Sequence, residues 1–273
     1  MSTINAADVS KLRKATGAGM MDCKKALSES DGDFDKAIDI IRKRGQLVAN
    51  KRADREATEG VVLAKVADNK GVMVSLNCET DFVAKNVDFV KLAESILNLA
   101  FSKYPANIEE LKSLTLDSKT VADILMEQIG IIGEKIDIGY YDKIEAPAVV
   151  PYIHMDKKLA TLVGFNKKVN EQVGKDVAMQ VAAMAPVAVD RTDVPKDIIE
   201  KEREIGREQA RMEGKPEEIL DKIAEGKLNK FFKEFTLLNQ EFTKDSKKTI
   251  AQYLKESDAE LKVTGFLRFS LKQ

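Results

Sequence analysis

The chain has 273 residues, of which 44% are hydrophobic and 33% charged, and its formal net charge is −1 at pH 7. This composition is typical of a soluble globular protein long enough for two or three modest domains. The near-neutral charge argues against direct binding of nucleic acid, which usually requires a large basic excess.

The same inventory argues against membrane insertion and cofactor chemistry. No segment approaches the roughly 18 consecutive apolar residues that cross a bilayer, and the first residues lack the basic and apolar regions of a signal peptide. We therefore expect a cytoplasmic protein. Cys23 and Cys78 lack metal or redox spacing and are expected to be buried free thiols. With one histidine and no P-loop motif, the chain is predicted to have no catalytic residue, metal or cofactor of its own.

Two short helices are predicted at the N-terminus. Asp8 is the expected N-cap of the first, because its side chain can accept from the free N–H groups of an opening turn. Gly17 is expected to end this helix, since glycine adopts the left-handed conformation that follows many helices. The second helix is expected from Met20 to Ser28.

A third helix completes a predicted bundle over residues 1–55. Asp33 is its expected N-cap and Gly45 its expected end, and the basic segment 51–55 is expected to be a linker. Its apolar residues recur at helical spacing, namely Phe34, Ala37, Ile38 and Ile41. Such a bundle lies near the lower size limit for independent folding.

Strand character begins at residue 60 and continues to residue 78. Two apolar runs flank a predicted turn at Asp68–Gly71, which indicates a β-hairpin. Helices are expected at 89–100 and 120–131, where apolar residues recur every three or four positions. These elements predict a first core subdomain over residues 56–145.

A similar unit follows. Strands are expected at 146–153 and 159–165, and a helix at 170–185. The chain ends with a predicted helix at 249–255 and a strand at 261–271, which can return to the same sheet. Two strand–loop–helix units of this kind indicate an α+β core of two related halves.

The intervening residues 195–240 indicate an antiparallel helical hairpin inserted in the second subdomain, which then comprises 146–194 and 241–273. Apolar residues recur every seven positions amid charge, at Ile198, Ile205 and Met212. The return helix is lined by Leu220, Ala224, Leu228, Phe231 and Phe235. Two interpretations remain open: the hairpin packs on its own domain, or it forms a protruding arm for a partner or for self-association.

Two motifs carry a resemblance to a known family. The segment LRKATGAGMMDCKKAL at 12–27 and the segment LNCETDFVAKN at 76–86 are similar to the two signatures of the elongation factor Ts family. Their order and the inserted hairpin also match, so the resemblance covers nearly the whole chain. It implies an N-terminal three-helix ubiquitin-associated-like bundle, a two-subdomain α+β core and an inserted antiparallel coiled-coil hairpin.

The resemblance also implies a function without enzymatic turnover. Family members are nucleotide exchange factors that bind elongation factor Tu in its GDP form and weaken its Mg²⁺ and phosphate contacts, so that GDP leaves and GTP enters. Some members continue past the final strand into a helical module that touches the GTPase. This chain stops at Gln273, so the bundle and the core are expected to suffice. The rival interpretations are an enzyme with a hidden carboxylate pair and an adaptor that binds ubiquitin-like proteins or RNA.

The first motif contains three candidate contact residues, Arg13, Met20 and Met21. Exposed methionine offers a flexible and polarizable contact surface, and arginine is enriched among residues that dominate binding energy. The alternative is that one methionine fills the small bundle core. By resemblance, all three residues dock on a helix of the partner's nucleotide domain.

The second motif and the only histidine supply the remaining candidates. Thr80 is a predicted N-cap. On sequence alone two interpretations stay open: Asp81 is an acidic residue of the first turn and Phe82 a core residue, or the two residues form an exposed binding site. By resemblance, Phe82 is instead an exposed wedge that enters the partner near its magnesium and nucleotide, with Asp81 beside it. His154 is usually a structural residue in such a setting, but the resemblance implies a contact with the partner's third domain.

Overall fold

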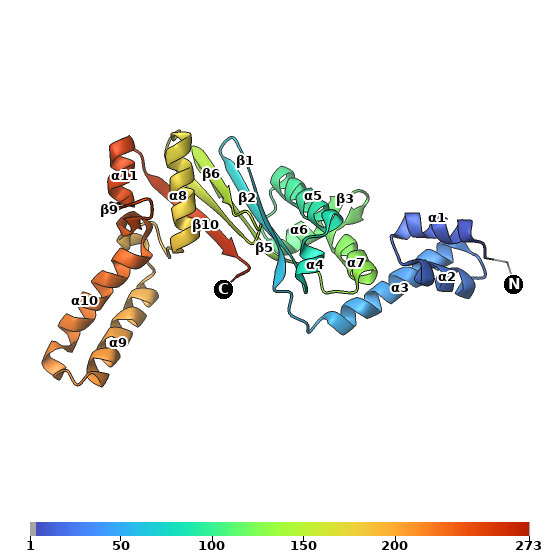
Figure 1. Ribbon diagram of the computed structural model, residues 1–273, viewed down its shortest axis with the longest axis horizontal. Helices are drawn as coiled ribbons and strands as arrows, with labels where there is room; N and C mark the ends of the chain where they lie inside the picture. The colour runs from blue at the N-terminus through green and yellow to red at the C-terminus, as the bar shows by residue number, and fades with distance from the viewer. Residues whose placement is uncertain (1–3, 273) are drawn as a thin grey trace. The chain divides into compact units, whose positions relative to one another are not determined.

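The computed structural model describes residues 4–272 and combines helices with β-sheets, which confirms the α+β expectation (Figure 1). The chain divides into two compact units. Among the described residues, the first contains the chain up to Leu63, the segment Val74–Tyr141 and residues 271–272. The second contains Ala64–Met73 and Asp142–Ser270.

The first unit opens with α1 (Ala6–Thr16), α2 (Met20–Glu29) and α3 (Phe34–Arg52). These helices pack around a small apolar core (Figure 1). Its buried members are Val9, Leu12, Ala18, Cys23, Ala26, Leu27 and Ala37.

Of the four helix ends predicted for this bundle, at Asp8, Gly17, Asp33 and Gly45, the structure confirms two. Gly17 ends α1 in the left-handed conformation, with φ at 69°, and Asp33 caps α3 by accepting from the Lys36 N–H at 3.0 Å, both as predicted. The prediction for Asp8 was wrong. Asn5 is the N-cap, and its side chain accepts from the Asp8 N–H at 2.8 Å. Asp8 lies three residues later and so occupies the acidic first turn.

The expected end of the third helix was also wrong. The helix α3 continues through Gly45 to Arg52, so the predicted linker begins inside a helix. Gly45 faces Gly130 of α7 (Val121–Ile132), where a Cβ atom added to Gly130 would lie 2.7 Å from the Gly45 Cα. The glycine therefore serves a close helix crossing and does not act as a cap.

A three-stranded sheet of order β1-β2-β5 contributes residues to both units. β1 (Glu59–Ala67) and β2 (Lys70–Cys78) form the predicted hairpin, but its turn is only Asp68 and Asn69, shorter than expected. The third strand, β5 (Asp137–Glu145), was not predicted. The other elements of the first unit are α4 (Asp81–Ala84), α5 (Val87–Lys103), α6 (Ile108–Ser113), β3 (Thr115–Leu116), β4 (Lys119–Thr120) and α7.

The second unit contains a sheet of order β10-β7-β6, whose strands pair antiparallel. Its strands are β6 (Ala148–Ile153), β7 (Leu159–Phe165) and β10 (Val263–Ser270). The C-terminal strand thus returns to this sheet, as predicted. Further elements of this unit are α8 (Glu171–Met184), the 3-10 turns Arg191–Asp193 and Leu237–Asn239, β8 (Glu241–Phe242), β9 (Asp245–Thr249) and α11 (Ile250–Ser257). Apolar side chains of β7, α8, α11 and β10 form the core.

A buried carboxylate joins α8 to α11 and to the turn between β8 and β9. Asp176 is only 5% exposed and accepts from Lys244 Nζ at 2.6 Å, Tyr253 OH at 2.8 Å and Gln172 Nε2 at 2.8 Å. Burial raises the pKa of Asp176, but these three donors outweigh that effect and hold the pKa below its ordinary value.

The inserted hairpin consists of α9 (Lys196–Met212) and α10 (Glu217–Phe235). The two helices meet through a seam of small and aliphatic side chains, namely Gly206, Ala210, Leu220, Ala224 and Leu228. Leu220, Ala224 and Leu228 are buried, as predicted for the return helix. Of the predicted seven-residue stripe on α9, Ile198 and Ile205 are half-buried, whereas Met212 is 87% exposed. Glycine and alanine allow a closer approach of the two backbones than a larger apolar residue would.

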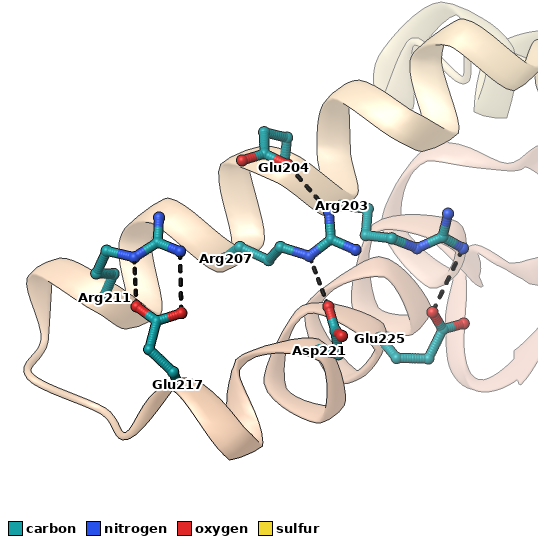
Figure 2. Close-up of polar contacts among 7 residues, drawn as sticks. All are labelled: Arg203, Glu204, Arg207, Arg211, Glu217, Asp221 and Glu225. Atoms are coloured by element: carbon teal, nitrogen blue, oxygen red, sulfur yellow. Dashed lines mark hydrogen bonds and ion pairs between the residues drawn. The ribbon is translucent and has the colours of Figure 1, made fainter.

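Ion pairs join the two helices beside this seam (Figure 2). Arginines one turn apart on α9 each face a carboxylate on α10, in the pairs Arg203–Glu225 at 3.5 Å, Arg207–Asp221 at 2.6 Å and Arg211–Glu217 at 2.8 Å. As the arginine numbers rise along α9, the numbers of their carboxylate partners fall along α10. The three pairs together therefore fit one antiparallel register of the two helices. Exposed pairs of this kind contribute little stability.

Candidate partner-binding site

The first candidate surface lies on the N-terminal bundle, where α1 turns into α2. Met20 and Met21 open α2 and are 59% and 65% exposed, so neither methionine fills the bundle core. The core is instead filled one turn away by Cys23 and, in the preceding loop, by Ala18. Arg13 is exposed in the last turn of α1, and its carbonyl accepts from the Gly17 N–H at 2.7 Å. The bundle therefore presents two methionines and an arginine to solvent.

The second candidate surface is the start of α4. Phe82 is the second residue of this one-turn helix and is 83% exposed, so the core interpretation of Phe82 was wrong. Thr80 caps the helix as predicted, with its hydroxyl 3.5 Å from the Val83 N–H. Asp81 pairs with Lys85 one turn later at 2.6 Å, and Ala84 is the residue of α4 that is buried. The helix thus points an aromatic ring outward while its opposite side is anchored.

A carboxylate from a distant part of the chain holds the loop that leads into α4. Glu134 follows the end of α7, and its Oε2 accepts from the N–H of Glu79 at 3.2 Å and of Thr80 at 3.0 Å. Its other oxygen accepts from the Thr80 hydroxyl at 2.7 Å. Sequence reasoning missed Glu134, because it lies 54 positions after Thr80 and no spacing signal connects the two residues.

The contact is reciprocal. The Glu79 carboxylate accepts from the Lys135 N–H at 2.7 Å, while Glu134 binds the Glu79 N–H in return. Both Glu79 oxygens also accept from Arg52 Nη1, at 3.1 and 2.8 Å, and the Glu79 side chain is only 15% exposed. We call the residues Glu79, Thr80, Glu134 and Lys135 the carboxylate clasp. Hydrogen bonds to ionised carboxylates are stronger than neutral ones, so the clasp restrains the loop on both sides.

Cys78 lies directly before the clasp and has no access to solvent. Its thiol donates to the Thr80 carbonyl at 3.2 Å. Burial raises the pKa of Cys78 to about 12, and the nearby Glu134 carboxylate adds to this shift. The thiol therefore stays protonated near neutral pH and is a poor nucleophile. Cys23 is buried as well, so both cysteines are the free buried thiols that the sequence predicted.

The third candidate surface belongs to the second unit. His154 is exposed directly after β6, and its Nδ1 lies 2.9 Å from the Tyr152 hydroxyl. The neighbouring Met155 is 93% exposed in the turn that leads to β7. The six predicted residues therefore occupy three surfaces: the bundle, the start of α4 and the turn after β6. The first two belong to the first unit and the third to the second unit.

Two kinds of feature are absent from residues 4–272, a cluster of metal-binding side chains and a membrane-spanning helix. No group of three or more His, Cys, Asp or Glu side chains in this part of the chain is arranged to hold a metal ion. None of its helices combines the length and the apolar character that a membrane span requires.

Comparisons with known proteins give a consistent result. The family model described as Elongation factor TS matches residues 79–273. The chain is 54% identical over 265 residues to the elongation factor Ts of Porphyromonas gingivalis, with 97% of each chain covered. It is 53% identical over 277 residues to that of Christiangramia forsetii, covering 99% of this chain and 100% of the other. The elongation factor Ts of Bacteroides fragilis is 42% identical over 326 residues, covering 98% and 99%.

Proposed function

The chain belongs to the elongation factor Ts family, and from this premise we propose that it releases GDP from elongation factor Tu as a guanine-nucleotide exchange factor. In this role it disturbs the Mg²⁺ and phosphate site of the GTPase. It needs no active site or cofactor of its own, because the chemistry is the loss of a ligand from its partner. The site of action is the cytoplasm, where the translational GTPase works.

The observation that carries the proposal is the 83% exposure of Phe82 on a loop held by the carboxylate clasp. Leaving a phenylalanine in water is unfavourable by about 1.5–3 kcal/mol relative to burial, so a partner that buries the ring gains binding energy. If the ring fits only a nucleotide site whose Mg²⁺ and phosphate contacts are displaced, the factor binds the nucleotide-free GTPase more tightly than the loaded one. That difference is the coupling that expels GDP.

The other candidate residues supply docking energy in this proposal. Met20 and Met21 offer adaptable apolar contacts to a helix of the nucleotide domain, and Arg13 adds a charged anchor. Asp81 acts beside the ring of Phe82. His154 contacts the third domain of the GTPase from the turn after β6. Arg13, Met20, Met21 and His154 are exposed and Asp81 is half-buried, which supports this assignment, because a docking residue must be accessible before the partner arrives.

We extend the proposal to the arrangement of the chain. Residues 1–55 form the ubiquitin-associated-like bundle, 56–145 the first core subdomain, and 146–194 with 241–273 the second. Residues 195–240 form a coiled-coil arm that serves self-association or partner affinity. The exposed Met212 near the tip supports an arm, because a hairpin that packed along its own domain would cover such a side chain.

The direct test is the release of fluorescent GDP from purified elongation factor Tu, followed by stopped-flow fluorescence with and without this protein. We expect the release rate to rise with the concentration of the protein and to reach a plateau. The final ratio of bound GDP to bound GTP should be the same with and without a catalytic amount of the protein, since an exchange factor changes the rates of nucleotide release and binding and not the relative affinities of the GTPase for GDP and GTP. An unchanged release rate at every concentration would refute the proposal.

A further inference from the structure

The carboxylate clasp lies directly before α4, the helix that carries the exposed ring of Phe82. The strand β2 ends at Cys78 and α4 begins at Asp81, so only Glu79 and Thr80 connect the sheet to the helix. Glu134 binds the backbone N–H of both connecting residues and the hydroxyl of the second. One side chain thus determines how the strand leads into the helix.

The helix α4 cannot set its own orientation. It has four residues, a single turn, and helices this short are not stable by themselves in water. Its direction therefore depends on its attachments, which include the buried Ala84, the Cys78 thiol that donates to the Thr80 carbonyl, and the clasp. Loss of the clasp would leave Phe82 on a loop that is free to adopt several conformations.

We propose that Glu134 is a positioning residue for nucleotide exchange: its carboxylate holds the Glu79–Thr80 loop so that Phe82 projects in the one orientation that enters the partner. The inference rests on the proposed exchange function. A side chain that is already ordered in its bound orientation binds without the entropy cost of ordering. If the loop holds that orientation for only a fraction of the time, the rate through it falls to the same fraction of its full value.

The main test compares substitutions of Glu134 by the maximal rate of GDP release and by the half-saturating factor concentration. Glu134→Ala removes all three acceptor contacts, and we expect about a tenfold lower maximal rate. Glu134→Gln keeps an oxygen that can accept from both N–H groups, so its rate should fall by less than about threefold. The matched control is Glu127→Gln on α7, the helix that precedes Glu134. The Glu127 carboxylate pairs with Lys119 at 2.7 Å and lies outside the clasp. This variant should behave as wild type.

A double-mutant cycle separates positioning from general destabilisation. If Glu134 acts through the aromatic ring, Glu134→Ala should change the rate by less than about twofold once Phe82 is already alanine. A tenfold loss that persists in the Phe82→Ala background would overturn the inference. So would a wild-type maximal rate for Glu134→Ala, or a change confined to the half-saturating concentration.

Amide hydrogen exchange of the protein alone supplies a second readout that does not use the GTPase. In Glu134→Ala, the amides of Glu79 and Thr80 should exchange at least about tenfold faster than in wild type, while Glu127→Gln leaves them unchanged. Unaltered exchange at both amides overturns the positioning role. If wild-type protein fails to accelerate GDP release, the proposed function fails, and these amide rates then decide alone whether Glu134 holds the loop.

A further variant covers the case in which Glu134→Ala does not fold. Thr80→Val keeps the size of the side chain and removes the hydroxyl, which donates to Glu134 at 2.7 Å and accepts from the Val83 N–H at the longer distance of 3.5 Å. About a threefold loss of maximal rate is expected. That loss should also vanish in the Phe82→Ala background. Equal losses in both backgrounds count against the inference.

Discussion

Replacing Phe82 by alanine tests the proposed function most directly. The ring is 83% exposed, so most of its apolar area is available for burial by a partner. Burying a whole phenylalanine side chain contributes about 1.5–3 kcal/mol, and the exposed share corresponds to about 1.2–2.5 kcal/mol. If that energy is gained only when the nucleotide site is displaced, Phe82→Ala should lower the maximal rate of GDP release by about 8- to 70-fold.

Because the ring is exposed, an effect of Phe82→Ala on exchange can be separated from an effect on folding stability. Since Phe82 contributes little to the folded core, the substitution should change the free energy of unfolding by less than about 0.5 kcal/mol. The assay is stopped-flow release of fluorescent GDP at saturating factor, with circular dichroism melting curves for each variant. Val87→Ala is the matched control, because Val87 opens α5, is apolar and is 66% exposed, yet lies outside the candidate residues.

Two results would refute the reasoning. A folded Phe82→Ala protein that releases GDP at the wild-type maximal rate would place the wedge elsewhere. An equal loss of rate in Val87→Ala would show that any exposed apolar residue near α4 matters, and that the ring has no special role.

Three further predictions concern the rest of the chain. Arg13→Ala and Met20→Ala should each weaken complex formation by about 1–3 kcal/mol, seen as a higher half-saturating factor concentration with a nearly unchanged maximal rate; unaltered half-saturation in both variants contradicts docking there. Replacing residues 197–235 by a short linker should change the oligomer mass in light scattering or the affinity for the partner more than the maximal exchange rate, and loss of maximal exchange by a folded core would refute this. Asp176→Asn should lower the free energy of unfolding at pH 7 by about 1–3 kcal/mol in urea titrations. Because the pKa of Asp176 is depressed in the folded protein, its contribution is present above the unfolded-state pKa of about 3.9 and fades as the pH falls below it, so a pH-independent difference would be the contrary result.

Local pattern was enough to predict most of the secondary structure. Strand β7 was predicted at its observed bounds, and α8 and α11 begin beside the capping residues Asn170 and Thr249. Two of the errors, at Gly45 and in the hairpin, share one cause, which is that tertiary contact overrode a local signal. Gly45 has the sequence appearance of a helix end, but it is buried inside α3 because the backbone of α7 crosses there.

In the hairpin, too, a local hydrophobic pattern did not predict which residues of α9 form the seam. The seven-residue repeat at Ile198, Ile205 and Met212 is real in the sequence, yet the seam between α9 and α10 uses Gly206 and Ala210. Small residues carry almost no hydrophobic signal, so a pattern search favours the larger side chains beside them. Close packing of two backbones is decided by the absence of side-chain volume, which a hydrophobicity pattern does not record.

The candidate site likewise contains residues that the sequence predicted and one residue, Glu134, that it did not. The two motifs were visible because each is continuous in the sequence, and the exposure of Met20, Met21 and Phe82 agrees with a role in binding. Glu134 was invisible, since a single glutamate after a helix is ordinary on a protein surface. Its importance arises only when the fold brings it to the loop after β2.

The position of Glu134 beside the loop that leads to Phe82 has a physical explanation that the motif alone does not provide. An exposed phenylalanine would ordinarily turn toward the nearest apolar surface, because burial stabilises it by more than a typical single hydrogen bond contributes. A ring that must stay in water until its partner arrives therefore needs a backbone that cannot turn it inward. Several charge-assisted hydrogen bonds to that backbone meet this need, and here they come from Glu134 to the two residues that precede α4. Exposed aromatic residues that serve as wedges should accordingly be sought where distant carboxylates bind the backbone N–H groups at their base.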